Sequence, residues 1–124
     1  MSAAVIWLDH DEAKIYRLKP GQVETEHLKN KQHLHHSGHD QDKARRDSNK
    51  FFHEVAKNLD GMSEILVMGP GQAKQEFVHH LEKHNHANLA QKIVGIESTD
   101  RLSENRILER ARVFFKTYNV FYGT

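Results

Sequence analysis

Histidines gather in two short segments of this 124-residue chain, and an imidazole can bind a metal ion or carry a proton near neutral pH. The first segment, HLHHSGHD at residues 33–40, contains His33, His35, His36 and His39. If it is extended, His33 and His35 share one side, and His39 or Asp40 completes a ligand set for Zn²⁺ or Ni²⁺. The spacing matches no established zinc motif, so His33, His35 and His39 are weak candidates for metal ligands.

A second interpretation of the same segment is contact with RNA. Four basic residues follow within one or two helical turns, namely Lys43, Arg45, Arg46 and Lys50. Imidazoles can stack on bases, while Arg and Lys bind phosphates, so the loop His33–Asp42 and the start of the next helix would form one surface. Three aspartates among residues 40–50 offset the four positive charges, and a solvated loop is the third interpretation.

The second histidine group consists of His79, His80, His84 and His86. On a helix, His80 and His84 are four residues apart, a spacing that can chelate a metal ion. The residues between them are Leu-Glu-Lys, so the segment is not the His-Glu-x-x-His motif of metalloproteases. We interpret this group as a solvated helix surface.

A second anion contact is predicted at GPGQAK, residues 69–74, where a strand leads into a helix. The free N–H groups of a helix start can hold a phosphate, and Lys74 would lie in the first turn. The spacing is not that of a P-loop, and a tight turn built by Gly and Pro is the alternative interpretation.

Nuclease chemistry with two Mg²⁺ ions needs several converging carboxylates. Asp9 and Glu54 could supply two of them, but residues 68–71 (MGPG) provide no third. No nucleophile–base pair can be assembled either. We therefore expect no catalytic residue and no cofactor, with an RNA or peptidyl-tRNA hydrolase and a His-rich metal-binding domain as the alternatives.

The elements that must position these residues follow from hydrophobic periodicity. Apolar runs and turn signals predict strands at residues 3–9, 13–18, 22–28, 63–68 and 92–96, and helices from about 44 to 59, from 73 to 84 and from about 103 onward. The order β-β-β-α-β-α-β-α predicts an α/β fold of the ribonuclease-H-like type, with a five-stranded mixed sheet and three helices. Right-handed crossovers would make the last two strands parallel to the first, and we expect both near the middle of the sheet.

Size and composition predict a single domain spanning residues 1–124. The chain has no cysteine, which excludes disulfides and thiolate metal sites. The apolar opening ends at Leu8, too early for a signal peptide or a spanning helix. We expect a cytoplasmic protein without a membrane partner.

Several motifs, taken in order, resemble translation factors. The strand that ends in Gly-Pro-Gly, followed by Lys74, Glu76 and Phe77, resembles the middle domain of Pelota and of eukaryotic and archaeal class 1 release factors. The segment KIVGIESTDRLSENRILERA resembles the last strand and helix of that domain. The whole chain is similar to small bacterial proteins labelled translational machinery proteins, in its WLDH opening, its HLHH segment and its VGIE strand.

The resemblance implies a ribonuclease-H-like domain associated with the ribosome. Release factors carry Gly-Gly-Gln on the loop after the third strand, whereas the corresponding loop here reads HHSGHDQDKARR. The chain contains no Gly-Gly-Gln, so the resemblance implies binding to the ribosome or structured RNA without peptide release.

At the C-terminus we expect Phe114, Phe115 and Tyr118 to cover the core, and Phe121 and Tyr122 are candidates for a homodimer contact.

Overall fold

The computed structural model describes residues 2–30, 41–84 and 86–122, and gives only the backbone for residues 41–47 and 120–122. The elements are β1 (Ala3–Leu8), β2 (Glu12–Lys19), β3 (Gln22–Lys29), α1 (Gln41–Lys57), β4 (Glu64–Gly69), α2 (Ala73–Lys83), α3 (Ala87–Ala90), β5 (Ile93–Ser98) and α4 (Glu104–Tyr122). No helix in this described part of the chain has both the length and the apolar content needed to cross a membrane.

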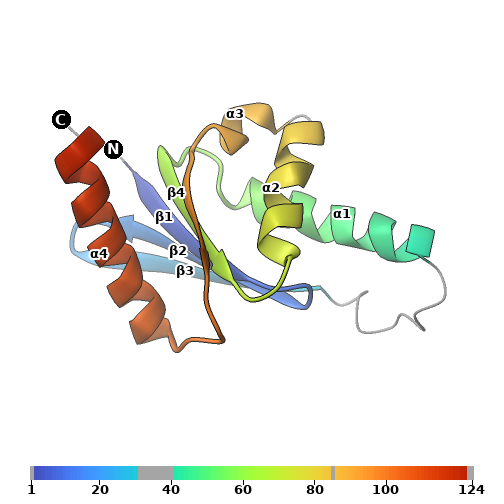
Figure 1. The fold of residues 1–124 in the computed structure, drawn as a ribbon, viewed down its shortest axis with the longest axis horizontal. Coiled ribbons are helices and arrows are strands. Elements are labelled where there is room, and N and C mark those ends of the chain that lie inside the picture. The colour runs from blue at the N-terminus through green and yellow to red at the C-terminus, as the bar shows by residue number, and fades with distance from the viewer. Residues whose placement is uncertain (1, 31–40, 85, 123–124) are drawn as a thin grey trace.

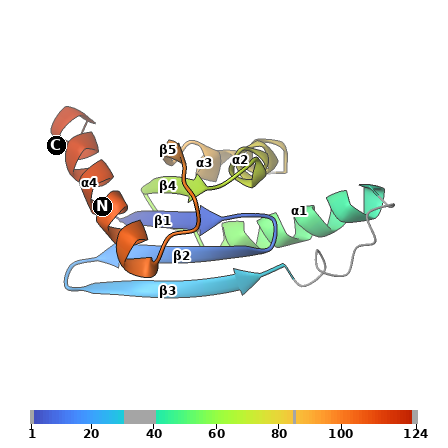
Figure 2. The same cartoon turned by 60° about the horizontal axis from the view of Figure 1, so that its bottom comes forward.

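The strands form one sheet in the order β3-β2-β1-β4-β5 (Figures 1 and 2). β1, β2 and β3 are an antiparallel meander, and β4 and β5 join it parallel to β1. The predicted α/β class, the five-stranded mixed sheet and the ribonuclease-H-like order of strands are confirmed.

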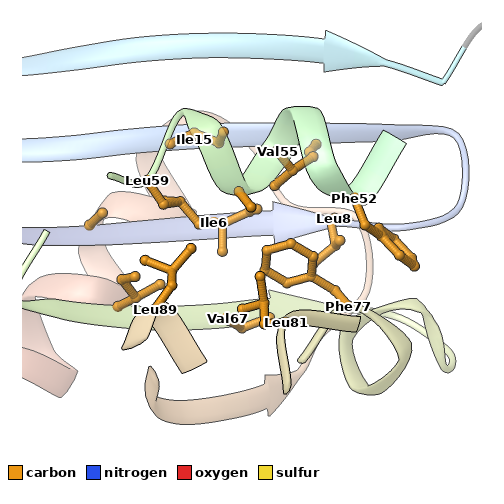
Figure 3. Packing of buried hydrophobic residues seen from close by; sticks show 14 of the residues in the cluster. Ile6, Leu8, Ile15, Phe52, Val55, Leu59, Val67, Phe77, Leu81 and Leu89 are labelled. Atoms are coloured by element: carbon orange, nitrogen blue, oxygen red, sulfur yellow. The ribbon is translucent and has the colours of Figure 1, made fainter. Parts of the chain in front are cut away.

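Helices cover both faces of the sheet. Successive side chains of a strand point to opposite faces, so β1 places Ile6 and Leu8 toward α1 and α2, and Val5 and Trp7 toward α4. On the first face, the buried positions of α1 and α2 interlock with β1 and β4 (Figure 3). Because β1 and β4 are covered on both sides, their residues from position 4 to 8 and 65 to 69 are all buried.

Two predictions about this architecture are wrong. The segment at residues 92–96 was expected near the middle of the sheet, but β5 is the edge strand, and Ile96 is 43% exposed. Both parallel connections add their strand on the same side of β1, so the last strand added has no neighbour beyond it. The structure also adds a fourth helix, the short α3, which has only four residues and therefore too little periodicity to predict.

Close packing at the end of β4 requires glycine. Gly69 has a φ of +152°, and a Cβ built there would lie 2.0 Å from the carbonyl oxygen of Leu8. The absence of a side chain therefore lets the end of β4 approach the end of β1, which sets where the following turn and α2 begin.

Candidate functional site

The loop predicted to bind RNA or metal leaves the sheet at a firmly held point. His33, His35, His36 and His39 themselves lie outside the described residues. Before them, the backbone N–H of Asn30 donates to the Asp11 carbonyl at 2.8 Å, and its side-chain Nδ2 donates to the His10 carbonyl at 3.1 Å. Asn30 is buried, so the end of β3 is attached to the β1–β2 turn.

After the loop, the chain enters α1. Lys43, Arg45 and Arg46 lie in the first turns of this helix, and only their backbone is described. Lys50 follows on the same helix with an exposed side chain. The start of α1 extends past the sheet (Figure 2), so these four positions lie on an element that leads away from the core.

The β1–β2 turn also contacts α2. Asp9 Oδ1 accepts hydrogen bonds from the backbone N–H groups of Asp11 at 2.8 Å and Glu12 at 2.9 Å, which fixes the turn. Next to it, His10 Nε2 lies 2.5 Å from Oε2 of Glu76 in the first turn of α2. The β1–β2 turn, the exit of β3 and the start of α2 therefore meet at one end of the sheet.

Lys74 lies within this region, but it is only 3% exposed. Its ammonium donates to the carbonyl oxygen of Gly71, inside the Gly-Pro-Gly turn. The structure thus brings Lys74 under the turn and does not place it on an open surface with Lys50. An anion could reach this ammonium only where the turn leaves it accessible.

A network that the sequence did not reveal joins β1 to the connection between β5 and α4. Trp7 is 1% exposed, and its indole Nε1 donates to Thr99 Oγ1 at 3.0 Å and to the Asp100 carbonyl at 3.1 Å. The Lys14 ammonium lies 5.7 Å, and the Arg101 guanidinium 6.0 Å, from the centre of the Trp7 ring, within the range of cation–π attraction.

Glu12 completes the network. It is 8% exposed, and one carboxylate oxygen lies 2.7 Å from His27 Nε2 while the other accepts from Arg101. A nearly buried carboxylate needs such partners, because losing water without them is costly. Glu12 therefore ties β2, β3 and the β5–α4 connection together, which points to a structural role.

The second histidine group proves to be part of a larger cluster. His80 packs face to face with His84, with ring centres 4.5 Å apart, and lies 6.0 Å from the ring of His86. His53 of α1 joins the cluster, with its Nδ1 3.0 Å from Nε2 of His86. The spacing of His80 and His84 indicated part of this arrangement, but His53 comes from another helix and could not be assigned to it.

His80 is the buried member, at 5% exposure. Its Nδ1 lies 3.3 Å from Oδ1 of Asn49, and its buried Nε2 has no hydrogen-bond partner among the residues that the structure describes. Burial, together with the neighbouring His84, His86 and His53, lowers the pKa of His80 from 6.5 to about 4. His80 is therefore neutral at physiological pH, and the interpretation of the whole group as a solvated surface is wrong for this residue.

The carboxylates considered for nuclease chemistry have other partners. Glu54 is exposed on α1 and lies 3.5 Å from Lys57 on the same helix, while Asp9 holds the β1–β2 turn. Among the side chains that the structure describes, no three or more His, Asp or Glu residues are grouped so that they could hold a metal ion.

Solved structures of Pelota and of an archaeal translation termination factor superpose on this chain. Pelota from Archaeoglobus fulgidus superposes with a TM-score of 0.63 at 18% identity, over 90% of this chain and 30% of that protein. Pelota from Thermoplasma acidophilum gives a TM-score of 0.63 at 17% identity, over 88% of this chain and 31% of its own. The archaeal translation termination factor aRF1 gives 0.57 at 16% identity, over 96% and 40%.

At these identities the likeness establishes the fold, which this chain shares with one part of Pelota and of aRF1. The chain spans about a third of the Pelota proteins that it matches. No protein-family model and no curated protein matches the sequence.

Proposed function

We propose that this chain is a non-catalytic, translation-related domain that binds the ribosome or structured RNA. The observation that supports the proposal most is the likeness to Pelota and aRF1 over 90% and 96% of the chain, with TM-scores of 0.63 and 0.57. The sequence itself resembles the middle domain of Pelota and of class 1 release factors. A ribosome partner would place the protein in the cytoplasm.

The proposed contact surface is the loop with His33, His35, His36 and His39, together with Lys43, Arg45, Arg46 and Lys50 of α1. Its support is positional. The loop leaves the sheet beside the β1–β2 turn, and α1 begins beyond the sheet (Figure 2). Lys74 remains a proposed second contact, although its ammonium is directed to the Gly71 carbonyl.

The absence of a release mechanism rests on the sequence. The chain contains no Gly-Gly-Gln, the motif that the release-factor resemblance would require for peptide release. Incubation with peptidyl-tRNA should therefore give no turnover above buffer, on or off the ribosome. Hydrolysis that scales with the amount of protein would contradict the non-catalytic part of the proposal.

The binding part is tested by sedimentation with purified ribosomes over a salt series. The wild-type chain should sediment with ribosomes at low salt and dissociate steeply between about 50 and 200 mM, because phosphate contacts release counterions. The double variant R45Q/R46Q should bind more weakly. The control K83Q/K92Q removes two exposed charges elsewhere and should bind like the wild type. Absence from the ribosomal fraction at low salt would refute the proposal.

A homodimer contact through Phe121 and Tyr122 also remains a proposal. Sedimentation equilibrium would show a mass that rises with protein concentration, and the F121A/Y122A variant would stay monomeric. A wild-type protein that is monomeric at every concentration would exclude this contact.

A further inference from the structure

An outward surface with a surplus of positive charge lies on α4. This helix contains four cations and only two acidic residues, Glu104 and Glu109, so its net charge is +2 in a chain whose formal net charge is +1. The four cations are all exposed, and they are Arg106, Arg110, Arg112 and Lys116. α1 has the same net charge of +2, from five cations and three acidic residues, so α1 and α4 are the two basic helices of the domain.

The cations of α4 are not committed to carboxylates. Among the residues described here, none of the four forms an ion pair, whereas Lys19 pairs with Glu24, Lys57 with Glu54 and Arg101 with Glu12. An anionic partner could therefore bind these cations without disrupting an ion pair within the domain. Exposed Arg and Lys side chains without partners also present all their donors to a ligand.

The helix presents these charges as two pairs. Ile107, Ala111 and Phe115 are buried against the sheet, so the opposite side of α4 faces outward. Arg106 and Arg110 are one turn apart on one flank of that side, and Arg112 and Lys116 are one turn apart on the other. The four positions extend over roughly 15 Å of helix axis.

The surroundings of α4 favour an extended, unspecific ligand. Arg110 borders a shallow hollow that it shares with two acidic residues, Glu97 and Glu109, and with the 63% exposed Val113. Arg112 borders another beside Gln22 in the β2–β3 hairpin. Phe114 and Tyr118, the aromatic side chains of α4 with intermediate exposure, lie beside these cations on the helix. Charge and guanidinium geometry point to phosphate groups.

We propose that the outer face of α4 binds the phosphate backbone of RNA, as a second contact surface in addition to the loop and α1. α4 and α1 cover opposite faces of the sheet (Figures 1 and 2). The domain would then lie between two RNA segments or two parts of one folded RNA. This inference rests on the proposed function and names a surface that the sequence did not single out.

The test measures binding of a short fluorescent RNA duplex by anisotropy, between about 50 and 200 mM salt. The variants R106Q/R110Q and R112Q/K116Q each remove one pair from α4, and glutamine preserves helix propensity. Each variant should weaken binding on the order of ten-fold or more near 0.1 M salt and reduce the salt slope by about 1 for each lost contact. K83Q/K92Q is the matched control and should leave both quantities unchanged.

The outcomes separate this inference from the proposed function. If both α4 variants keep the wild-type affinity and salt slope while R45Q/R46Q loses affinity, the inference is wrong and the proposed function stands. If the wild type binds neither RNA nor ribosomes at low salt, the proposed function itself fails. If α4 variants lose binding to phosphatidylglycerol vesicles while wild-type RNA binding is undetectable, the partner of α4 is a membrane surface, which also overturns the inference. Unchanged melting curves establish that the variants are folded.

Discussion

Replacing His80 by phenylalanine should make the domain less sensitive to acid. The folded protein holds the pKa of His80 at about 4, mainly through burial, against an ordinary value of 6.5. The unfolded chain therefore takes up a proton near pH 6.5, whereas the folded protein does not. The stability contributed by the neutral side chain is complete above pH 6.5 and is lost as the pH falls toward 4. The H80F variant has no such proton to bind.

The size of this effect follows from the two pKa values. Integrating the difference in bound protons between pH 7 and pH 5 gives a loss of about 2 kcal/mol in the free energy of unfolding for wild type. H80F loses the 3.3 Å contact with Asn49, but it also removes the buried Nε2, which has no partner in the described part of the chain. Its stability at pH 7 should therefore be within about 1 kcal/mol of wild type. The phenyl ring can pack on Phe52, whose ring centre lies 5.7 Å from that of His80.

Urea unfolding at pH 7, 6 and 5 measures the difference, with the fluorescence of Trp7 as the signal, since this is the single tryptophan and it is buried. Other groups also titrate in this range, so the quantity of interest is the wild-type value minus the H80F value at each pH. The control H79F makes the same substitution at the exposed neighbouring position. The difference in stability between wild type and H79F should be the same at all three pH values. A wild-type minus H80F difference that stays constant within about 0.5 kcal/mol from pH 7 to 5 would refute the reasoning.

Two further predictions concern contacts at the end of the sheet. G69A should destabilise the domain by more than about 3 kcal/mol, because the new Cβ would lie 2.0 Å from the Leu8 carbonyl oxygen. G71A should cost about 1 kcal/mol for its φ of +60°, because no described atom lies within 4 Å of a Cβ built there. Chemical denaturation of both variants checks this order. A double-mutant cycle with E12Q and R101Q should give a coupling of about 1 kcal/mol, since Glu12 is buried and Arg101 is exposed, and additive losses would show that the pair contributes nothing.

Hydrophobic periodicity is enough to predict most of this fold. The four-residue spacing of Phe51, Val55 and Leu59 marked the face of α1 that the structure buries. Apolar runs also marked β1 and β4, which are covered on both sides. The run at residues 92–96 looks the same in sequence, yet Ile96 is 43% exposed, because strand order depends on how the chain connects the elements and not on the strand itself.

The candidate site shows where sequence alone is insufficient. The position of Lys74 after Gly-Pro-Gly suggested an accessible ammonium, but accessibility depends on how α2 packs against the turn, and Lys74 is 3% exposed. The spacing of His80 and His84 indicated neighbours on one helix. Contacts with Asn49 and His53 depend on the docking of α1 against α2, which no local pattern describes.

The central claim is that this domain binds the ribosome or structured RNA through charge. The most direct measurement is copurification of the tagged full chain with ribosomal subunits from its own cells, washed at low and at high salt. The account predicts that the chain stays in the ribosomal fraction at low salt and is released at high salt. A chain that is absent from that fraction at low salt, or that stays bound equally at high salt, would contradict it.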